Sequence, residues 1–284
     1  MPSPSHPTRP PRRRTWPSII AAFVAFYVLM LFPPVHAHVQ ALDVALARLM
    51  NGWLGHSRMF DLSIGALNSK AGDRLVVAGI LLLLALHVLV GRDRPARARR
   101  MAFWIWTILL FTVIYQGQRM VEDGFTRDSP GKVLEPWFDL RDAYGIKAKT
   151  TNTNSYPSGH GTAYYFFAFM ALRHYRSMGL LLLVMAAVLP TTRIVTGAHW
   201  PSDLFLGSLP LALLFSALAH EPSLRHWLRR LTVWCDALLR MLNGRRRRTL
   251  RRRLAAAWTE FTADRSPLRD ADRRADSLHS DSEA

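Results

Sequence analysis

The chain has 284 residues, half of them hydrophobic, and a formal net charge of +17 at pH 7. This length accommodates one membrane domain with its tails, and the single cysteine, Cys235, excludes an intrachain disulfide and a cysteine-based metal site. The charges gather in a few Arg-rich blocks, and the apolar runs between them exclude an ordinary soluble domain. So large a basic excess indicates either nucleic-acid binding or a membrane protein with its arginines on the cytoplasmic side.

An Arg-rich segment, residues 1–17, precedes the first apolar stretch, Ser18–Phe32. The same pattern, followed by Val35–Ala37, is typical of a secretory signal that is cleaved after Ala37. We favour a span that is retained, because the apolar segments that follow require membrane insertion in any case. Cleavage would leave the orientation of the rest of the chain unchanged.

Five more apolar segments follow, namely Leu75–Val90, Met101–Gln116, Ser158–Leu172, Met178–Val195 and Leu204–Ala219. Most are shorter than the roughly 20 residues that cross about 30 Å of hydrocarbon. Flanking Trp, Tyr, Arg and Lys side chains can reach the interface and make up the difference. Together the segments predict an all-α fold, a six-transmembrane-helix bundle over residues 18–220 with short extramembrane helices.

The distribution of charge predicts the orientation of this bundle. If the N-terminus is cytoplasmic, that side also receives 91–100, 173–176 and 221–284, and these pieces with 1–17 hold nearly all of the excess of +17. The positive-inside rule demands this arrangement. We therefore expect a multi-pass protein of the inner (plasma) membrane with both termini cytoplasmic, and no nucleic-acid partner.

The basic C-terminal tail, 221–284, divides into two parts. Over Ser223–Leu242, Leu and Trp recur at helical spacing among arginines, which predicts an amphipathic helix lying on anionic lipid. Arg245–Arg248 and Arg251–Arg253 extend the basic patch. The stretch after them is rich in Asp, Arg and Ser and is predicted to be disordered.

The connection between the fifth and sixth segments, Thr192–Asp203, gathers polar residues at one face of the membrane. Pro201 is well placed to begin a helix, so that Asp203 falls in its first turn, four residues after His199. A carboxylate at that spacing can hold one imidazole nitrogen and leave the other free and basic. Arg193 could fork onto phosphate oxygens. Taken singly, each residue is also compatible with helix capping or an interfacial position.

A second polar group, Pro157–His160, begins the fourth segment. It lies on the same side of the membrane as the connection 117–157, which follows the third segment. Ser158 and Gly159 would lie at a helix start, where backbone N–H groups and the helix dipole attract an anion. His160 could protonate a departing alkoxide. A simple N-cap turn is the structural alternative, and both interpretations can hold together.

The paired motif, Pro157–His160 followed by Arg193, His199 and Asp203, resembles the type 2 phosphatidic acid phosphatase family, which shares its phosphate pocket with the vanadium haloperoxidases. The motifs cover about 119–207, and the six apolar segments extend the resemblance over the whole membrane domain. Haloperoxidases are soluble, which argues against their activity here.

The resemblance implies that His199 is a nucleophile that forms a phosphohistidine, that Asp203 orients it, and that His160 is the general acid for the leaving group. It also implies that Arg193 and the pair Ser158 and Gly159 bind the phosphate oxygens. Neither a metal nor another cofactor is expected, since guanidinium and backbone N–H groups stabilise the charge.

The first motif of that family, Lys-x6-Arg-Pro, is not present as such. Its nearest counterpart is Arg119 followed by Thr126–Pro130, in which Arg127 fits the arginine role and Arg119 lies one residue too far away. Lys132 could instead reach the phosphate from the other side. For Arg119 and Lys132, a solvated loop charge is the alternative interpretation.

By this resemblance the leading hypothesis is an integral-membrane lipid phosphatase whose active site faces the periplasm. Its substrate would be a lipid phosphate or diphosphate, such as undecaprenyl diphosphate, phosphatidylglycerol phosphate or lipid A. The altered first motif is similar to that of a subgroup that transfers phosphate from undecaprenyl diphosphate to lipid A, so a phosphotransferase is the alternative. A non-enzymatic carrier or scaffold is the third hypothesis, although the polar residues lie at the ends of the segments, with His87 as the exception.

Overall fold

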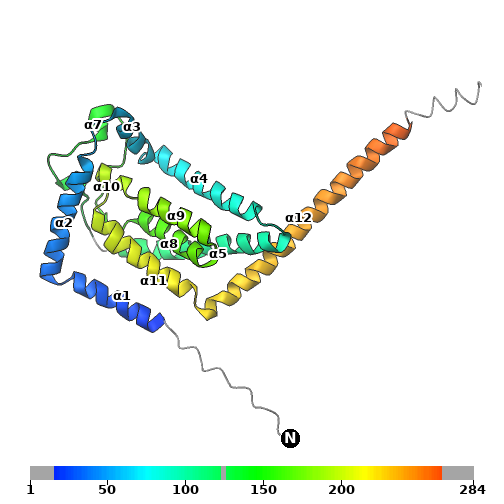
Figure 1. Cartoon of the computed structure of the whole chain (residues 1–284), viewed down its shortest axis with the longest axis horizontal. Helices are drawn as coiled ribbons and strands as arrows, with labels where there is room; N and C mark the ends of the chain where they lie inside the picture. Colours follow the sequence, from blue (N-terminus) through cyan, green and yellow to red (C-terminus); the bar gives the residue numbers. More distant parts are fainter. Residues whose placement is uncertain (1–15, 123–125, 264–284) are drawn as a thin grey trace, which may run out of the picture.

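The computed structural model describes residues 16–122 and 126–263, and its regular secondary structure there is helical apart from two isolated β-bridges (Figure 1). This confirms the predicted all-α class. The helices are, in chain order, α1 (Trp16–Met30), α2 (Pro33–Asn51), α3 (Arg58–Leu67), α4 (Lys70–Leu89), α5 (Arg94–Glu122), α6 (Pro130–Val133), α7 (Leu140–Tyr144), α8 (Gly159–His174), α9 (Arg176–Val188), α10 (Thr192–Thr196), the π-helical turn η1 (Asp203–Ser208), α11 (Leu209–Ala219) and α12 (Pro222–Ala263).

Helix α8 lies at the centre of the bundle and packs against α5, α9 and α11. Its aromatic residues Tyr165 and Phe166 are buried in the main core. The chain turns at Tyr175 into α9, and the two helices approach so closely that a Cβ on Gly179 would lie 2.4 Å from the Leu172 backbone nitrogen. Only glycine tolerates that contact. The close packing of this hairpin holds α8, and with it the first turn of α8, in place along the bundle.

Three helical stretches are long and apolar enough to cross a membrane, namely Lys70–Leu89, Arg94–Met120 and Arg176–Thr196. Two bent pairs, α1 with α2 at 79° and η1–α11 with α12 at 74°, raise the number of candidate spans to five if each pair counts as one. The central helix α8 has 16 residues, which is short for an independent span. The described residues thus contain three to five candidate spans, and the count of six stays a prediction.

The two ends of the bundle differ in their chemistry (Figure 1). At one end the connections assigned to the cytoplasm meet: Arg100 donates a 2.7 Å hydrogen bond to the His87 carbonyl oxygen, and the His174 ring stacks on His220. At the other end lie α2, α3, α7, α10 and the first turn of α8. The polar motifs therefore meet at the end opposite those connections, which is the arrangement that alternating spans predict.

The predicted amphipathic helix is longer than expected and has a different neighbour. It forms the first half of α12, and its apolar side packs on α5, with Cys235 buried against Ala98 and Ala102. Arg94 of α5 pairs with Asp236 at 2.8 Å. Protein, rather than lipid alone, thus covers part of the apolar stripe, because the small alanines of α5 admit a close helix contact.

Beyond that contact, α12 projects away from the bundle (Figure 1). The arginine clusters 245–248 and 251–253 fall within its C-terminal half. The segment predicted to be disordered after Arg253 therefore begins as helix, which continues to Ala263. The remainder, 264–284, and the N-terminal residues 1–15 lie outside the described residues.

Candidate active site

The candidate site is assembled by two elements and one loop. They meet at the end of the bundle where α2, α3, α7 and α10 lie, here called the functional end. The first turn of α8 supplies the Pro157–His160 motif, and the run from α10 into η1 supplies Arg193, His199 and Asp203. Ser208 joins them, because its hydroxyl donates to the Ser158 carbonyl oxygen at 2.7 Å and to the Asp203 carbonyl oxygen at 2.9 Å. The π-helical turn η1 brings Asp203 to this position, and such turns are frequent at functional sites.

His199 is buried, with only 4% of its surface exposed. Its Nδ1 lies 2.8 Å from the Ser155 carbonyl oxygen and 3.4 Å from the Asp203 carboxylate. Because a carbonyl oxygen can only accept, Nδ1 carries the proton and donates it. The Nε2 lone pair is then available for attack. Asp203 thus lies beside this imidazole, and its orienting role stays a prediction; the Ser155 carbonyl is the nearer partner, a contact that residue spacing could not reveal.

Asp203 is fully buried and receives two strong hydrogen bonds. The Trp200 backbone N–H donates to one carboxylate oxygen at 2.8 Å, and Arg127 donates to the other at 2.6 Å. An ionised carboxylate with this many donors keeps a fixed orientation. The local turn that begins after His199 and the distant loop residue Arg127 therefore hold Asp203 from opposite sides.

Arg127 makes a second ion pair that the sequence analysis missed. Its guanidinium lies 2.6 Å from Asp43, which is buried in α2, and 2.8 Å from the Ser202 hydroxyl. The 79° bend between α1 and α2 lays α2 across this end of the bundle and so delivers Asp43. The only sequence signal for Asp43 was an acidic residue within an otherwise apolar and basic stretch. The phosphate contact predicted for Arg127 is not among these contacts and stays a prediction.

Two aromatic side chains cover the Arg127 guanidinium. Its carbon lies 5.4 Å from the Trp200 ring centroid and 6.0 Å from that of Tyr156. Burial raises the pKa of the Tyr156 phenol well above its usual range, so this ring stays neutral. The cation therefore faces the π-systems of two uncharged rings, which favour its present position.

Arg193 lies in α10 and is 4% exposed. Its Nη2 forms an ion pair with Asp73, in the first turn of α4, and lies 3.3 Å from Nε2 of His160. Since a guanidinium can only donate, His160 accepts through Nε2 and is neutral in this arrangement. The other terminal nitrogen of Arg193, Nη1, is buried without a hydrogen-bond partner. Asp73 was not predicted, and the phosphate contact predicted for Arg193 stays a prediction.

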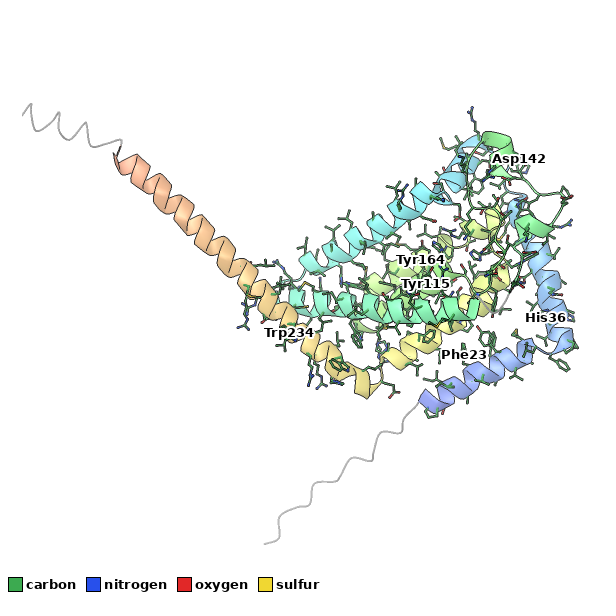
Figure 2. All side chains as sticks on the ribbon, turned by 180° about the vertical axis from the view of Figure 1, so that it is seen from behind. Phe23, His36, Tyr115, Asp142, Tyr164 and Trp234 are labelled. Atoms are coloured by element: carbon green, nitrogen blue, oxygen red, sulfur yellow. The ribbon has the colours of Figure 1, made fainter. Side chains whose placement is uncertain are left out.

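The first turn of α8 is shaped as predicted. Ser158 is its N-cap, and its hydroxyl accepts from the Gly161 N–H at 3.3 Å. A Cβ on Gly159 would lie 3.1 Å from the Tyr115 ring of α5, so a side chain there would crowd the wall of the site. Figure 2 labels Tyr115 on α5 and Tyr164 on α8. Unpaired N–H groups of a helix start attract anions.

A small hollow of about 10 Å³, room for roughly one water molecule, lies beside Arg193. Its lining residues are Leu67, Asn68, Asp73, Val76, Tyr164, Leu189, Thr192 and Arg193. Polar and apolar side chains are therefore next to each other around this hollow.

The remaining two predicted phosphate ligands are Lys132, in the short helix α6, and Arg119, in α5. Lys132 pairs with Asp128 at 2.6 Å, and both side chains are more than 40% exposed. Arg119 lies in the last turn of α5. The loop itself is tied to the site, because the Gly131 N–H donates to the Gly197 carbonyl oxygen at 2.9 Å. The phosphate-binding roles of Lys132 and Arg119 stay predictions.

Comparison with known proteins relates part of the chain to one family. The model of the PAP2 superfamily matches residues 123–224. Lipid A 1-diphosphate synthase of Escherichia coli (strain K12) is 24% identical over 199 residues, which cover 69% of this chain and 80% of that protein. YbjG of the same organism, provisionally named an undecaprenyl-diphosphatase, is 34% identical over 86 residues, which are 27% of this chain and 43% of that protein.

Among solved structures, the fold is similar to that of a transmembrane PAP2 type phosphatidylglycerolphosphate phosphatase from Bacillus subtilis, with a TM-score of 0.43, 16% identity, and coverage of 72% of this chain and 93% of that chain. The residues matched by the family model contain both motifs that meet at the functional end of the bundle. The match to the PAP2 superfamily is limited to this part of the chain, which carries the candidate site.

Proposed function

We propose that this protein is an integral-membrane lipid phosphatase in which His199 is the nucleophile. The observation that carries the proposal is the joint placement of His199, His160 and Arg193 at one end of the bundle. His199 is buried with its Nδ1 proton donated to Ser155 and its Nε2 lone pair available. Arg193 lies against His160 and has a buried nitrogen without a partner. Together these groups suit a phosphate bound between two imidazoles.

In the proposed reaction, Nε2 of His199 attacks phosphorus in line with the leaving oxygen. The N–P bond forms while the P–O bond to the lipid breaks, and His160 gives a proton to the departing oxygen. Arg193 and the first N–H groups of α8 stabilise the charge on the remaining oxygens. His160 must first gain a proton, which becomes favourable when the anion draws Arg193 away from Nε2. Water then hydrolyses the phosphohistidine, with His160 as the base.

The positions of the supporting residues give each a distinct part in this proposal. Asp203 stabilises the imidazolium that forms on His199, as in other base–carboxylate pairs. Arg127 and Asp43 hold Asp203 in place. For Arg127 to bind phosphate as well, it would have to release one of these carboxylates. We place the site at the periplasmic face of the inner membrane, on the basis of the positive-inside rule.

The test uses purified His199→Ala and His160→Ala protein and a panel of undecaprenyl diphosphate, phosphatidylglycerol phosphate, phosphatidic acid and lipid A. We expect phosphate release to fall by at least about a hundredfold in each, because both remove a group of the reacting centre. His174→Ala is the control, since His174 lies at the other end of the same helix. Release at the wild-type rate from both active-site variants would refute the proposal.

A phosphotransferase is the second candidate function. The similarity to a lipid A 1-diphosphate synthase, which spans 80% of that protein, favours it. The same phosphohistidine would then pass its phosphate to lipid A, with undecaprenyl diphosphate as donor, instead of to water. Donor labelled with ³²P decides between the two: label that appears on lipid A indicates transfer, and label found only in inorganic phosphate indicates hydrolysis.

A further inference from the structure

Helix α12 carries more apolar surface than the protein itself covers. One stripe lies against α5 and consists of Leu228, Leu231, Cys235 and Leu239. A neighbouring stripe is left 44–74% exposed and consists of Trp227, Trp234, Leu238 and Met241. The members of each stripe recur every three or four residues, so each stripe follows one side of the helix. A row of large apolar side chains in full contact with water is typical of a surface that binds a partner.

The rest of this helix is strongly basic. Residues 222–263 contain eleven arginines and two acidic residues. One of the acidic residues, Asp236, already forms ion pairs with Arg94 of α5 and with Arg240, both at 2.8 Å. Arg229 lies on the side of the helix away from the exposed stripe, as 3.6 residues per turn require. The helix therefore keeps a large positive excess that suits an anionic partner.

The direction of α12 favours one kind of anionic partner. Its first half, Leu224–Gly244, makes an angle of 74° with the apolar stretch Asp203–Ala219. If that stretch crosses the bilayer, a helix nearly perpendicular to it runs along the membrane surface. Only four residues separate Ala219 from Leu224, so α12 begins at the level where the span leaves the hydrocarbon. Figure 1 shows α12 continuing past the bundle at the end away from α2 and α10.

The exposed stripe also lies where a bilayer around the bundle would meet it. It is next to the stripe that packs on Ala98 and Ala102, in the first part of α5, a helix long and apolar enough to span a membrane. Arg230 lies at the border of the exposed stripe, with its guanidinium carbon 5.4 Å from the Trp227 ring centroid. Tryptophan and arginine are typical of the headgroup level, because the ring and the alkyl stem enter the apolar layer while the cation meets phosphate.

We propose that α12 is an interfacial helix that binds anionic lipid headgroups at the bilayer surface opposite the candidate site. The exposed stripe enters the apolar edge of that leaflet, α5 covers the neighbouring stripe, and the arginines face the headgroup phosphates. This assignment is independent of the reaction at the candidate site. It also separates the residues that contact lipid from those that contact protein within one amphipathic pattern.

Site-directed spin labelling of the full-length protein in vesicles tests this proposal. Cys235→Ala removes the only cysteine, and Trp234→Cys in that background places one nitroxide on the exposed stripe. Vesicles of phosphatidylethanolamine and phosphatidylglycerol provide the anionic surface. We expect relaxation of this nitroxide by oxygen, which concentrates in lipid, to exceed its relaxation by a water-soluble nickel chelate. Arg229→Cys, on the opposite side of the same helix, is the matched control and should show the reverse order.

Leu238→Cys gives a second label on the stripe, so that the test holds even if Trp234→Cys disturbs the fold. In vesicles of phosphatidylcholine alone, both labels should shift toward relaxation by the nickel chelate, because the arginines lose their anionic partner. Equal values in the two kinds of vesicle would overturn the anionic assignment. Relaxation mainly by the nickel chelate in the anionic vesicles would overturn the whole proposal, since the stripe would then face water. Protection from both reagents would overturn it as well and would indicate that a second copy or another protein covers the stripe.

Discussion

The net charge around the candidate site depends on individual carboxylates. Asp73 is the first of these to test by substitution. It holds Arg193 through an ion pair and lies 3.9 Å from Nε2 of His160. It therefore occupies the side of Arg193 that faces His160, where the proposed function would place a phosphate oxygen. Binding of phosphate requires this carboxylate either to turn away or to share the guanidinium.

Asp73→Asn should bind orthovanadate several-fold more tightly than wild type, because a negative charge next to the anion is removed. The same change should lower the melting temperature of the empty protein, since Arg193 is left buried without its counter-charge. Orthovanadate should then restore more stability than it does in wild type. Thermal unfolding with and without orthovanadate measures both effects. Asp142→Asn, on an exposed helix away from the motifs, is the control; weaker orthovanadate binding by Asp73→Asn would contradict this account.

Asp43 provides a second test at the residue scale. Asp43 is 3% exposed and pairs with Arg127, whereas Asp128 pairs with Lys132 on the surface. Asp43→Ala should cost about 3 kcal/mol of unfolding free energy, because removing one partner of a buried pair strands the other charge. Asp128→Ala should cost less than about 1 kcal/mol. Denaturant titration in detergent measures both, and equal losses would show that burial does not set the value of these pairs.

Activity gives a further readout of Asp43. If it acts by holding Arg127 against Asp203, Asp43→Asn should lower kcat and leave the KM for the lipid nearly unchanged. A rise in KM alone would mean instead that Asp43 belongs to substrate binding. The distinction separates a positioning residue from one that touches the lipid.

At the scale of elements, the α8–α9 hairpin depends on one glycine. Gly179→Ala would press a methyl group onto the backbone of Leu172, and such overpacking costs about 1–3 kcal/mol or more. Gly79 of α4 has no atom within 4 Å of its would-be Cβ, so Gly79→Ala should be neutral or stabilising in a helix. Unfolding midpoints of the two variants check the difference. Equal stability would indicate that the hairpin can separate without loss.

Helix α12 shows why an amphipathic pattern does not name its partner. The stripe that includes Leu228, Leu231 and Cys235 was interpreted as facing lipid, yet it packs on α5. Trp227 and Trp234 remain exposed and are available to a membrane surface. The same apolar side chains could face either lipid or protein. They face protein because two alanines of α5, far away in the sequence, allow the helices to pack closely.

At the scale of the whole molecule, the separation of the two ends predicts the topology. A green fluorescent protein fused after Ala284 should fluoresce, and alkaline phosphatase at the same position should be inactive, because we place that terminus in the cytoplasm. The matched fusion after Ala143, in α7 at the functional end, should show the reverse. The opposite pair of results would move the site to the cytoplasmic face.

Much of the site could be read from local spacing. His199 and Asp203 lie close because a helix begins at Pro201, just after His199, and Asp203 falls in its first turn. Ser158 caps α8 because a hydroxyl before a helix satisfies its free N–H groups. The apolar segments all became helices, since their backbone polar groups require partners wherever water is scarce. Periodicity and capping are properties of neighbouring residues, and they determine these features wherever the chain goes.

The tertiary structure decided what surrounds that local geometry. Asp43 and Asp73 come from α2 and α4, and neither stands at a fixed distance in sequence from the arginine it pairs with. Arg127 has the spacing of a phosphate ligand, but the bend before α2 places a carboxylate against it. The sequence by itself thus determined the helices and the local spacing of the two motifs, whereas the chemical roles of their residues stay proposals. Folding set the charge balance around them, because Coulomb interactions depend on distance in space, which no local pattern encodes.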